Sequence, residues 1–219
     1  MDKSGMVKRY LCFLVGVLIN SFGIGFITKA ALGTSPISSL PCVLSLRFTP
    51  TLGEFTFVMN TGFILAQIVL LRREFQKIQI LQILVNVVFS GFIDVSMSLL
   101  TALDFQPQGY AMELISLLAG CAILALGIYV EVSAKVLMVP GEGIVDAIAK
   151  VSGKEFGSVK VCFDVTLMGT ATVLSLVFFH GLQGVREGTV ISAVLVGLIV
   201  KLYHRILPGI AKIGTPEAA

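Results

Sequence analysis

The feature that most constrains the fold of this chain is an internal repeat. Residues 11–71 match residues 115–175 at a constant offset, without a gap, and after a two-residue slip residues 83–91 match residues 189–197. The matches that carry the repeat are Gly16 with Gly120, Gly23 with Gly127, Pro36 with Pro140, and Gly53 with Gly157. Apolar identities are frequent in an apolar chain, whereas coincident glycines and prolines are not. The sequence therefore predicts two copies of one unit, residues 1–105 and residues 106–219.

The composition predicts an integral membrane protein. Of the 219 residues, 56% are hydrophobic and only 13% are charged, and the mean hydropathy is +0.95, which leaves too little polar surface for a soluble globule. The net charge is +3 and the basic residues form short clusters between apolar runs, so we do not expect a nucleic-acid partner. The four cysteines stand singly in apolar stretches, and we expect neither a metal site nor a cofactor.

Six apolar runs are long enough to cross a bilayer, which requires about 20 residues of helix. They cover residues 10–28, 55–71, 78–100, 111–130, 159–179 and 189–206. Two shorter runs, residues 36–46 and 141–149, reach only about half of the ~30 Å hydrocarbon core at ~1.5 Å per residue. They occupy equivalent places in the two copies. Each copy is therefore predicted to contain three transmembrane helices and one short re-entrant half-helix.

The basic residues predict the orientation of the chain in the membrane. If both short segments enter and leave on one side, the loop at 101–110, which has no Lys or Arg, lies outside and both termini are cytoplasmic. The basic residues then inside are Arg72, Arg73, Lys77, Lys135, Lys150, Lys154, Lys201, Arg205 and Lys212. Three crossings per copy carry the chain to the opposite side, so the second copy would be inverted relative to the first. The predicted fold is an all-α membrane protein built from two inverted repeats.

The residues around the start of each short segment form the candidate site. Glycine permits positive φ or a close approach of backbones, proline favours the first turn of a helix, and Thr34 or Ser35 can cap the first segment. Backbone that begins a helix at membrane depth is tolerated only where it faces protein or water. The predicted substrate-binding residues are Gly33, Thr34, Ser35, Pro36, Ser38, Asn60, Pro140, Gly141, Glu142, Gly143 and Asp146. The alternative is that both segments are capped turns that only reverse the chain.

Acidic residues distinguish the two copies. The first copy has Ile27, Ser38, Cys42 and Asn60 where the second has Glu131, Glu142, Asp146 and Asp164. An ionisable group inside a span costs at least ~2.5 kcal/mol and usually faces a cavity or a partner. We therefore predict that Glu131, Glu142, Asp164 and the nearby Lys160 couple to an ion or a proton. The alternative is internal pairing of Glu131 with Lys135 and of Asp164 with Lys160, each four residues apart on one helix face.

Four segments of the chain resemble the bacterial YczE/YyaS/YitT-like integral membrane family. These segments are residues 23–36, 139–143, 160–164 and 184–189, and the most specific are Gly-Thr-Ser-Pro at 33–36 and Pro-Gly-Glu-Gly at 140–143. The resemblance covers most of the chain and implies a bacterial inner-membrane protein. It supplies no substrate and no catalytic residues. In parts of the family the second segment is closer to Gly-Pro-x-Asp-Gly, so the Glu142 position departs from that pattern.

The predicted architecture is typical of secondary transporters. We expect a transporter or permease for a small polar or charged solute that works by alternating access at the repeat interface. A membrane scaffold or a regulator of an envelope pathway would have the same composition and is the alternative. No nucleophile with a neighbouring His or acid and no phosphate-binding loop is present, so the sequence does not indicate an enzyme. The expected partners are the lipid bilayer and a small solute, and a homodimer is compatible with a chain of this size.

Overall fold

The computed structural model describes residues 3–75 and 77–211, and this part of the chain is helical without any β-strand. Its elements are α1 (Lys3–Lys29), α2 (Pro36–Arg47), α3 (Leu52–Leu71), the 3₁₀ turns η1 (Arg72–Glu74) and η2 (Lys77–Leu81), α4 (Gln82–Ala102), α5 (Tyr110–Ala134), α6 (Pro140–Ser152), α7 (Phe156–Phe179), α8 (Glu187–Ile206) and α9 (Pro208–Ala211). The predicted all-α fold is confirmed for these residues. Lys212, one of the basic residues assigned to the cytoplasmic side, lies outside the described residues.

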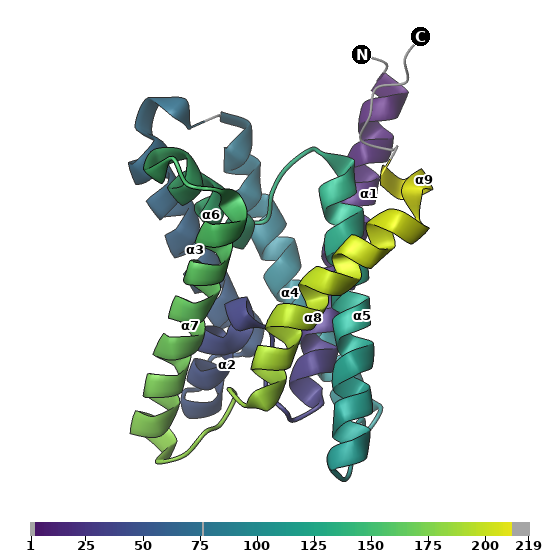
Figure 1. Cartoon of the computed structure of the whole chain (residues 1–219), viewed down its shortest axis with the longest axis vertical. Coiled ribbons are helices and arrows are strands. Elements are labelled where there is room, and N and C mark those ends of the chain that lie inside the picture. The colour runs from purple at the N-terminus through teal and green to yellow at the C-terminus, as the bar shows by residue number, and fades with distance from the viewer. Residues whose placement is uncertain (1–2, 76, 212–219) are drawn as a thin grey trace.

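Six of the described helices are long and apolar enough to cross a membrane, and they coincide with the six predicted runs. They are α1, α3, α4, α5, α7 and α8. The two short runs form α2 and α6, of 12 and 13 residues. Figure 1 shows that successive long helices run in alternate directions and that the start of α1 lies at the same end of the molecule as α9. The chain is therefore a multi-span membrane protein.

The equivalent helices α1 and α5 cross at the glycines that define the repeat. A Cβ atom added to any of these glycines would overlap the backbone or side chain of the facing helix. The facing pairs are Gly16 with Glu131, Gly23 with Leu124, Gly127 with Asn20, and Gly120 with Ile27. Residue numbers rise along α1 as they fall along α5, so the two helices are antiparallel. The same pairs result when the two copies are exchanged, and the small residues let the helix backbones approach closely.

Helix packing follows the repeat for most pairs of helices. α1 packs against α4 as its counterpart α5 packs against α8, and α3 packs against α6 as α7 packs against α2. α3 also packs closely against α4, whereas the equivalent helices α7 and α8 are scarcely in contact. The two halves of the chain therefore use matching helix pairs but differ in whether their last two long helices are packed together.

Both short helices begin with a proline. Pro36 and Pro140 occupy the first turn, and the residues before them, Ser35 and Val139, are extended as helix-capping residues are. The prediction that Thr34 or Ser35 caps α2 through its side chain is wrong, since α2 has no side-chain cap hydrogen bond. The Ser35 hydroxyl donates instead to Ser38 Oγ at 3.0 Å. Proline and extended backbone are thus sufficient to start these helices.

The loop before α2 is fixed to the first two turns of α8. Thr34 N donates to Thr189 Oγ1 at 3.2 Å, and Ser192 Oγ donates to the Thr34 carbonyl at 3.2 Å. Gly33 has a φ of +117°, a conformation that L side chains rarely adopt, and a Cβ there would overlap Thr189 Oγ1. These contacts join the two copies, because the loop belongs to the first and α8 to the second.

Candidate functional site

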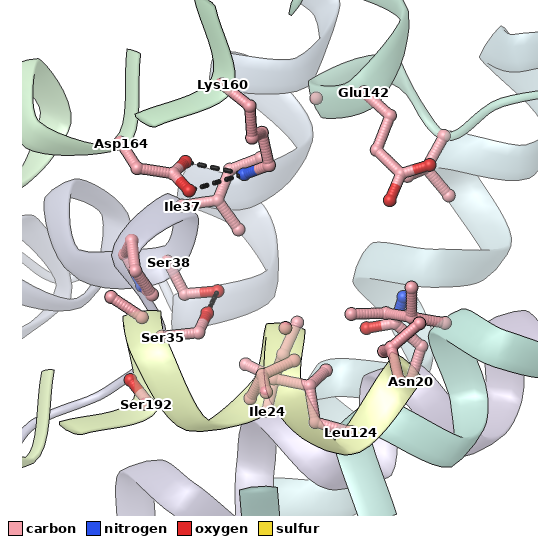
Figure 2. A pocket seen from close by; sticks show the side chains of 18 of the residues that line it. Asn20, Ile24, Ser35, Ile37, Ser38, Leu124, Glu142, Lys160, Asp164 and Ser192 are labelled. Atoms are coloured by element: carbon pink, nitrogen blue, oxygen red, sulfur yellow. Dashed lines mark hydrogen bonds and ion pairs between the residues drawn. The ribbon is translucent and has the colours of Figure 1, made fainter. Parts of the chain in front are cut away.

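A cavity of about 390 Å³ lies where the starts of α2 and α6 meet α7 and α8. This volume is typical of small-molecule sites. Figure 2 shows the side chains that line the cavity, which come from both copies of the repeat. The predicted site residues among them are Ser35, Pro36, Ser38, Asn60, Gly141, Glu142, Lys160 and Asp164. The structure therefore gathers segments that are more than 100 residues apart in the sequence into one site.

The first turns of α2 and α6 approach each other at this cavity. A Cβ atom on Gly141 would overlap Ile37 Cδ1, so a larger residue would require the Ile37 side chain on α2 to move. Gly141 lies inside α6 and has no positive φ. The sequence left open whether glycine is needed here for a positive φ or for a close approach. The close approach is therefore the reason that applies.

Glu142 lies in the first turn of α6 and its side chain points into the cavity (Figure 2). Among the residues that the structure describes, none forms a hydrogen bond or an ion pair with this carboxyl group. Lys160 and Asp164 act on it electrostatically, with opposite signs. Glu142 also lines a second cavity, of about 900 Å³. It therefore stands between two cavities without a bonded partner.

Glu131 lies behind the cavity wall on α5 and is 1% exposed. One carboxyl oxygen, Oε2, accepts a hydrogen bond from Asn20 Nδ2 at 3.2 Å, and the other, Oε1, has no hydrogen-bond partner among the described residues. The alternative in which Glu131 pairs with Lys135 is wrong. Helix α5 ends at Ala134, and Lys135 adopts a left-handed conformation, so the four-residue spacing no longer places the two side chains on one helix face. The Glu131 carboxyl interacts electrostatically with that of Glu142.

Lys160 and Asp164 form an ion pair on α7. The Lys160 ammonium donates to both carboxylate oxygens of Asp164, at 2.6 and 2.7 Å. The prediction that these two residues pair along one helix face is confirmed. Both also line the cavity, and Figure 2 shows the ammonium directed at Asp164 rather than at Glu142. The charge of Lys160 is therefore compensated within its own helix.

Other predicted site residues lie outside the lining of this cavity, namely Gly33, Thr34, Pro140, Gly143, Asp146 and Glu131. Gly33 and Thr34 fix the loop to α8, as described above. The Pro140 carbonyl accepts a hydrogen bond from Gln67 Nε2 at 3.2 Å, and a Cβ on Gly143 would sit 2.7 Å from Gln67 Oε1. Asp146 forms an ion pair with Lys150 at 2.6 Å and lines the second cavity.

The structure contains a group of buried amide side chains, and of these the sequence predictions included only Asn60. Asn20 lines the cavity, Gln67 donates to Gln82 Oε1 at 3.2 Å, and Asn60 donates to Asn86 Oδ1 at 3.0 Å. All five are at most 5% exposed. The signal that could have found the others is a polar amide inside an apolar run.

The described residues offer no metal centre. No three or more His, Cys, Asp or Glu side chains among them are placed to hold an ion. The four cysteines are free thiols.

The chain belongs to a family of unknown function (DUF6198), which matches residues 7–205. It is similar to the uncharacterized membrane protein YczE of Bacillus subtilis (strain 168). The two sequences are 27% identical over 202 residues, which cover 91% of this chain and 86% of the Bacillus protein. The resemblance to a YczE-like membrane family is thereby confirmed. No solved structure matches the chain.

Proposed function

We propose that this protein is a secondary transporter for a small polar or charged solute, which binds in the cavity between α2, α6, α7 and α8. The observation that carries the proposal is the position of Glu142. This carboxyl group lines both cavities and has no bonded partner among the described residues. Ionisable groups inside membrane proteins are costly, and they commonly mark substrate or ion pathways.

The proposed architecture is a pair of inverted repeats, residues 1–105 and residues 106–219, each with one re-entrant half-helix. It is supported by the antiparallel, reciprocal crossing of α1 and α5 and by the short lengths of α2 and α6, whose starts meet at the cavity. Transporters with inverted repeats commonly bind solute where two interrupted or short helices meet near the middle of the bilayer.

Alternating access would arise from an exchange of conformations between the two copies. In the structure α3 and α4 are packed together while α7 and α8 are apart. An exchange would bring α7 and α8 together and separate α3 from α4, which would move the opening of the site to the other side. The glycine-rich crossing of α1 and α5 lies between the copies and is suited to be the pivot.

Glu131 and Glu142 are the proposed coupling residues. Two carboxyl groups that interact in a site poor in water repel each other when both are ionised. A bound cation or a shared proton relieves this repulsion. Loss of that cation or proton on one side of the membrane would therefore favour the alternative conformation. Lys160 and Asp164 would contribute as a compensated pair in the wall of the site.

We further propose that the protein lies in a bacterial cytoplasmic membrane with both termini in the cytoplasm. The start of α1 and helix α9 lie at the same end of the molecule (Figure 1). Lys150 lies in the last turn of α6, Lys154 lies between α6 and α7, and Arg205 lies in the last turn of α8. This placement agrees with the rule that basic loops stay in the cytoplasm.

A solute screen on the purified protein tests the proposal. A solute at about 100 times its Kd stabilises the folded state by about 2.7 kcal/mol, which raises Tm by roughly 5–10 °C. The solute that does so should be transported into liposomes containing the protein. The variant Glu142→Gln should lose both effects, whereas Glu155→Gln, which changes an exposed acid outside both cavities, should keep them. If no solute class raises Tm and Glu142→Gln behaves as wild type in cells, the scaffold or regulator is the better assignment.

A further inference from the structure

The cavity opens sideways, between α7 and α8. Its lining includes Val161 on α7 and Ala193 and Gly197 on α8, all of which are exposed, and α7 and α8 are scarcely in contact. Val161 is 65% exposed, and a Cβ added to Gly197 would find no atom within 4 Å. Both helices are membrane spans. In a bilayer this opening therefore faces lipid, so the site can exchange molecules with the membrane as well as with water.

The wall of the cavity is apolar over most of its extent. The apolar residues that line it include Ile24, Phe89, Leu124, Ile128, Val139 and Val196. Figure 2 shows Ile24 and Leu124 across the cavity from the Lys160–Asp164 pair. An apolar wall provides no hydrogen-bond partners for a fully polar solute, but it accommodates the hydrocarbon part of an amphipathic solute.

The charges inside the site favour a cation. Among the described residues Glu142 has no bonded partner. The Glu131 carboxyl with which it interacts is stabilised by Asn20 and by the backbone of Val139, and its Oε1 atom has no hydrogen-bond partner among these residues. The Lys160 ammonium is held by both oxygens of Asp164. The remaining basic residue of the lining, Lys201, is exposed near the end of α8. Among the described residues, the interior thus presents one carboxyl group without a bonded partner, that of Glu142, and no ammonium group without one.

We infer that the solute of this transporter is an amphipathic organic cation that enters from the bilayer between α7 and α8 and places its charged group beside Glu142. The inference rests on the proposed function and adds the substrate class and the route of entry. The apolar part of the solute would lie against the wall formed by α1, α5 and α8. The small residues Ala193 and Gly197 would leave room for it to pass.

Photolabelling of the full chain in uncharged lipid nanodiscs tests this inference. The probe is decyltrimethylammonium with a photoreactive diazirine on its chain, used well below its micelle concentration, and labelled residues are identified by mass spectrometry. We expect labelling of the cavity walls on α7 and α8, with at least a tenfold loss in Glu142→Gln. Decyltrimethylammonium should compete at least tenfold better than tetramethylammonium or decyl sulfate.

Blocking the opening separates the route of entry from binding itself. Gly197→Trp and, on the facing helix, Val161→Trp should each lower cavity labelling at least tenfold. Val173→Trp, which adds the same ring at an exposed position of α7 away from the cavity, should change labelling less than twofold. Val161→Trp decides the question if Gly197→Trp does not fold.

The outcomes that contradict the inference differ from those that contradict the proposed function. Unchanged labelling in both blocked variants overturns entry from the bilayer. Equal competition by tetramethylammonium overturns the apolar part of the solute, and equal competition by decyl sulfate overturns its charge, while the transporter proposal stands. If no compound competes and Glu142→Gln is labelled as wild type, the probe reports ordinary lipid contact and the proposed function fails with the inference.

Discussion

One pair of equivalent positions makes different contacts in the two copies of the repeat. In the first copy Asn60 on α3 donates to Asn86 Oδ1 on α4 at 3.0 Å, and the two helices are packed together. The equivalent residues of the second copy are Asp164 on α7 and Ser192 on α8. Both line the cavity, and each is bonded elsewhere, Asp164 to Lys160 and Ser192 to the loop before α2.

In the proposed repeat architecture, this difference would let one repeated unit provide both a closed and an open wall. Asn60 and Asn86 satisfy each other across α3 and α4, so separating these helices would leave amides unpaired in an apolar environment. Asp164 and Ser192 are satisfied without each other, so α7 and α8 can lie apart at little cost. In the second copy Asp164 replaces the amide of Asn60. This replacement thus occurs where the two helices lie apart, not where they pack more tightly.

The largest expected effect concerns the orientation of the two copies in the membrane. Thr49 and Lys154 lie in exposed connections at nearly equivalent places of the repeat. In a background without the four native cysteines, Thr49→Cys and Lys154→Cys should react from opposite sides of the membrane. A membrane-impermeant maleimide applied to intact cells should label only the Thr49 position, and the Lys154 position should react only after the cells are opened.

Gln108→Cys, in the connection between α4 and α5, is the control for the outer side and should label in intact cells. If the Thr49 and Lys154 positions label from the same side, the copies are not inverted. The closed and the open copy would then not be related by an inverted-repeat symmetry.

The next largest effect concerns charge at the start of the short helices. Glu142 in α6 is equivalent to Ser38 in α2, and both line the cavity. A contact to a charged group contributes about 1.5–3 kcal/mol, so Glu142→Gln should weaken solute binding roughly 10- to 150-fold. Ser38→Ala should weaken it severalfold at most. Both Kd values can be measured by isothermal titration with the solute from the screen, and equal losses would remove the special role of the second copy.

The membrane class, the six spans and the two short helices could be predicted because each depends on local sequence. Span length follows from the thickness of the bilayer, and Pro36 and Pro140 mark helix starts whatever surrounds them. The Lys160–Asp164 pair was predictable for the same reason, since four residues of helix place both side chains on one face.

The remaining features of the site depend on contacts between distant segments. The partner of Glu131 is Asn20, 111 residues away, and Lys135 is excluded only because α5 stops one residue before it. Likewise, Gly141 is explained by Ile37 on the other short helix. A single sequence offers the residue types for such contacts, but not the crossing of α1 and α5 that brings the segments together.

A smaller effect tests that crossing. Gly127 faces the backbone of Asn20 so closely that a Cβ would overlap it, whereas Gly169, in the middle of α7, has no atom within 4 Å of a Cβ. Overpacking costs about 1–3 kcal/mol, so Gly127→Val should lower Tm by roughly 2–12 °C. Gly169→Val should leave Tm near that of the wild type, because it adds a side chain in open space. Thermal unfolding of the purified variants measures both, and equal Tm values would mean that α1 and α5 do not pack through these glycines.

The smallest expected effect concerns the pair Asn60 and Asn86 and its equivalent, Asp164 and Ser192. A double-mutant cycle of Asn60→Leu and Asn86→Leu should give a coupling free energy of about 0.6 kcal/mol, the average for hydrogen-bonded pairs between membrane helices. The matched cycle of Asp164→Asn and Ser192→Ala should give a coupling near zero, because these residues share no contact across the cavity. Thermal unfolding in nanodiscs supplies the four stabilities of each cycle. A coupling between Asp164 and Ser192 as large as that between Asn60 and Asn86 would mean that α7 and α8 pack together in the membrane. The open wall, and with it the sideways entrance to the site, would then be lost.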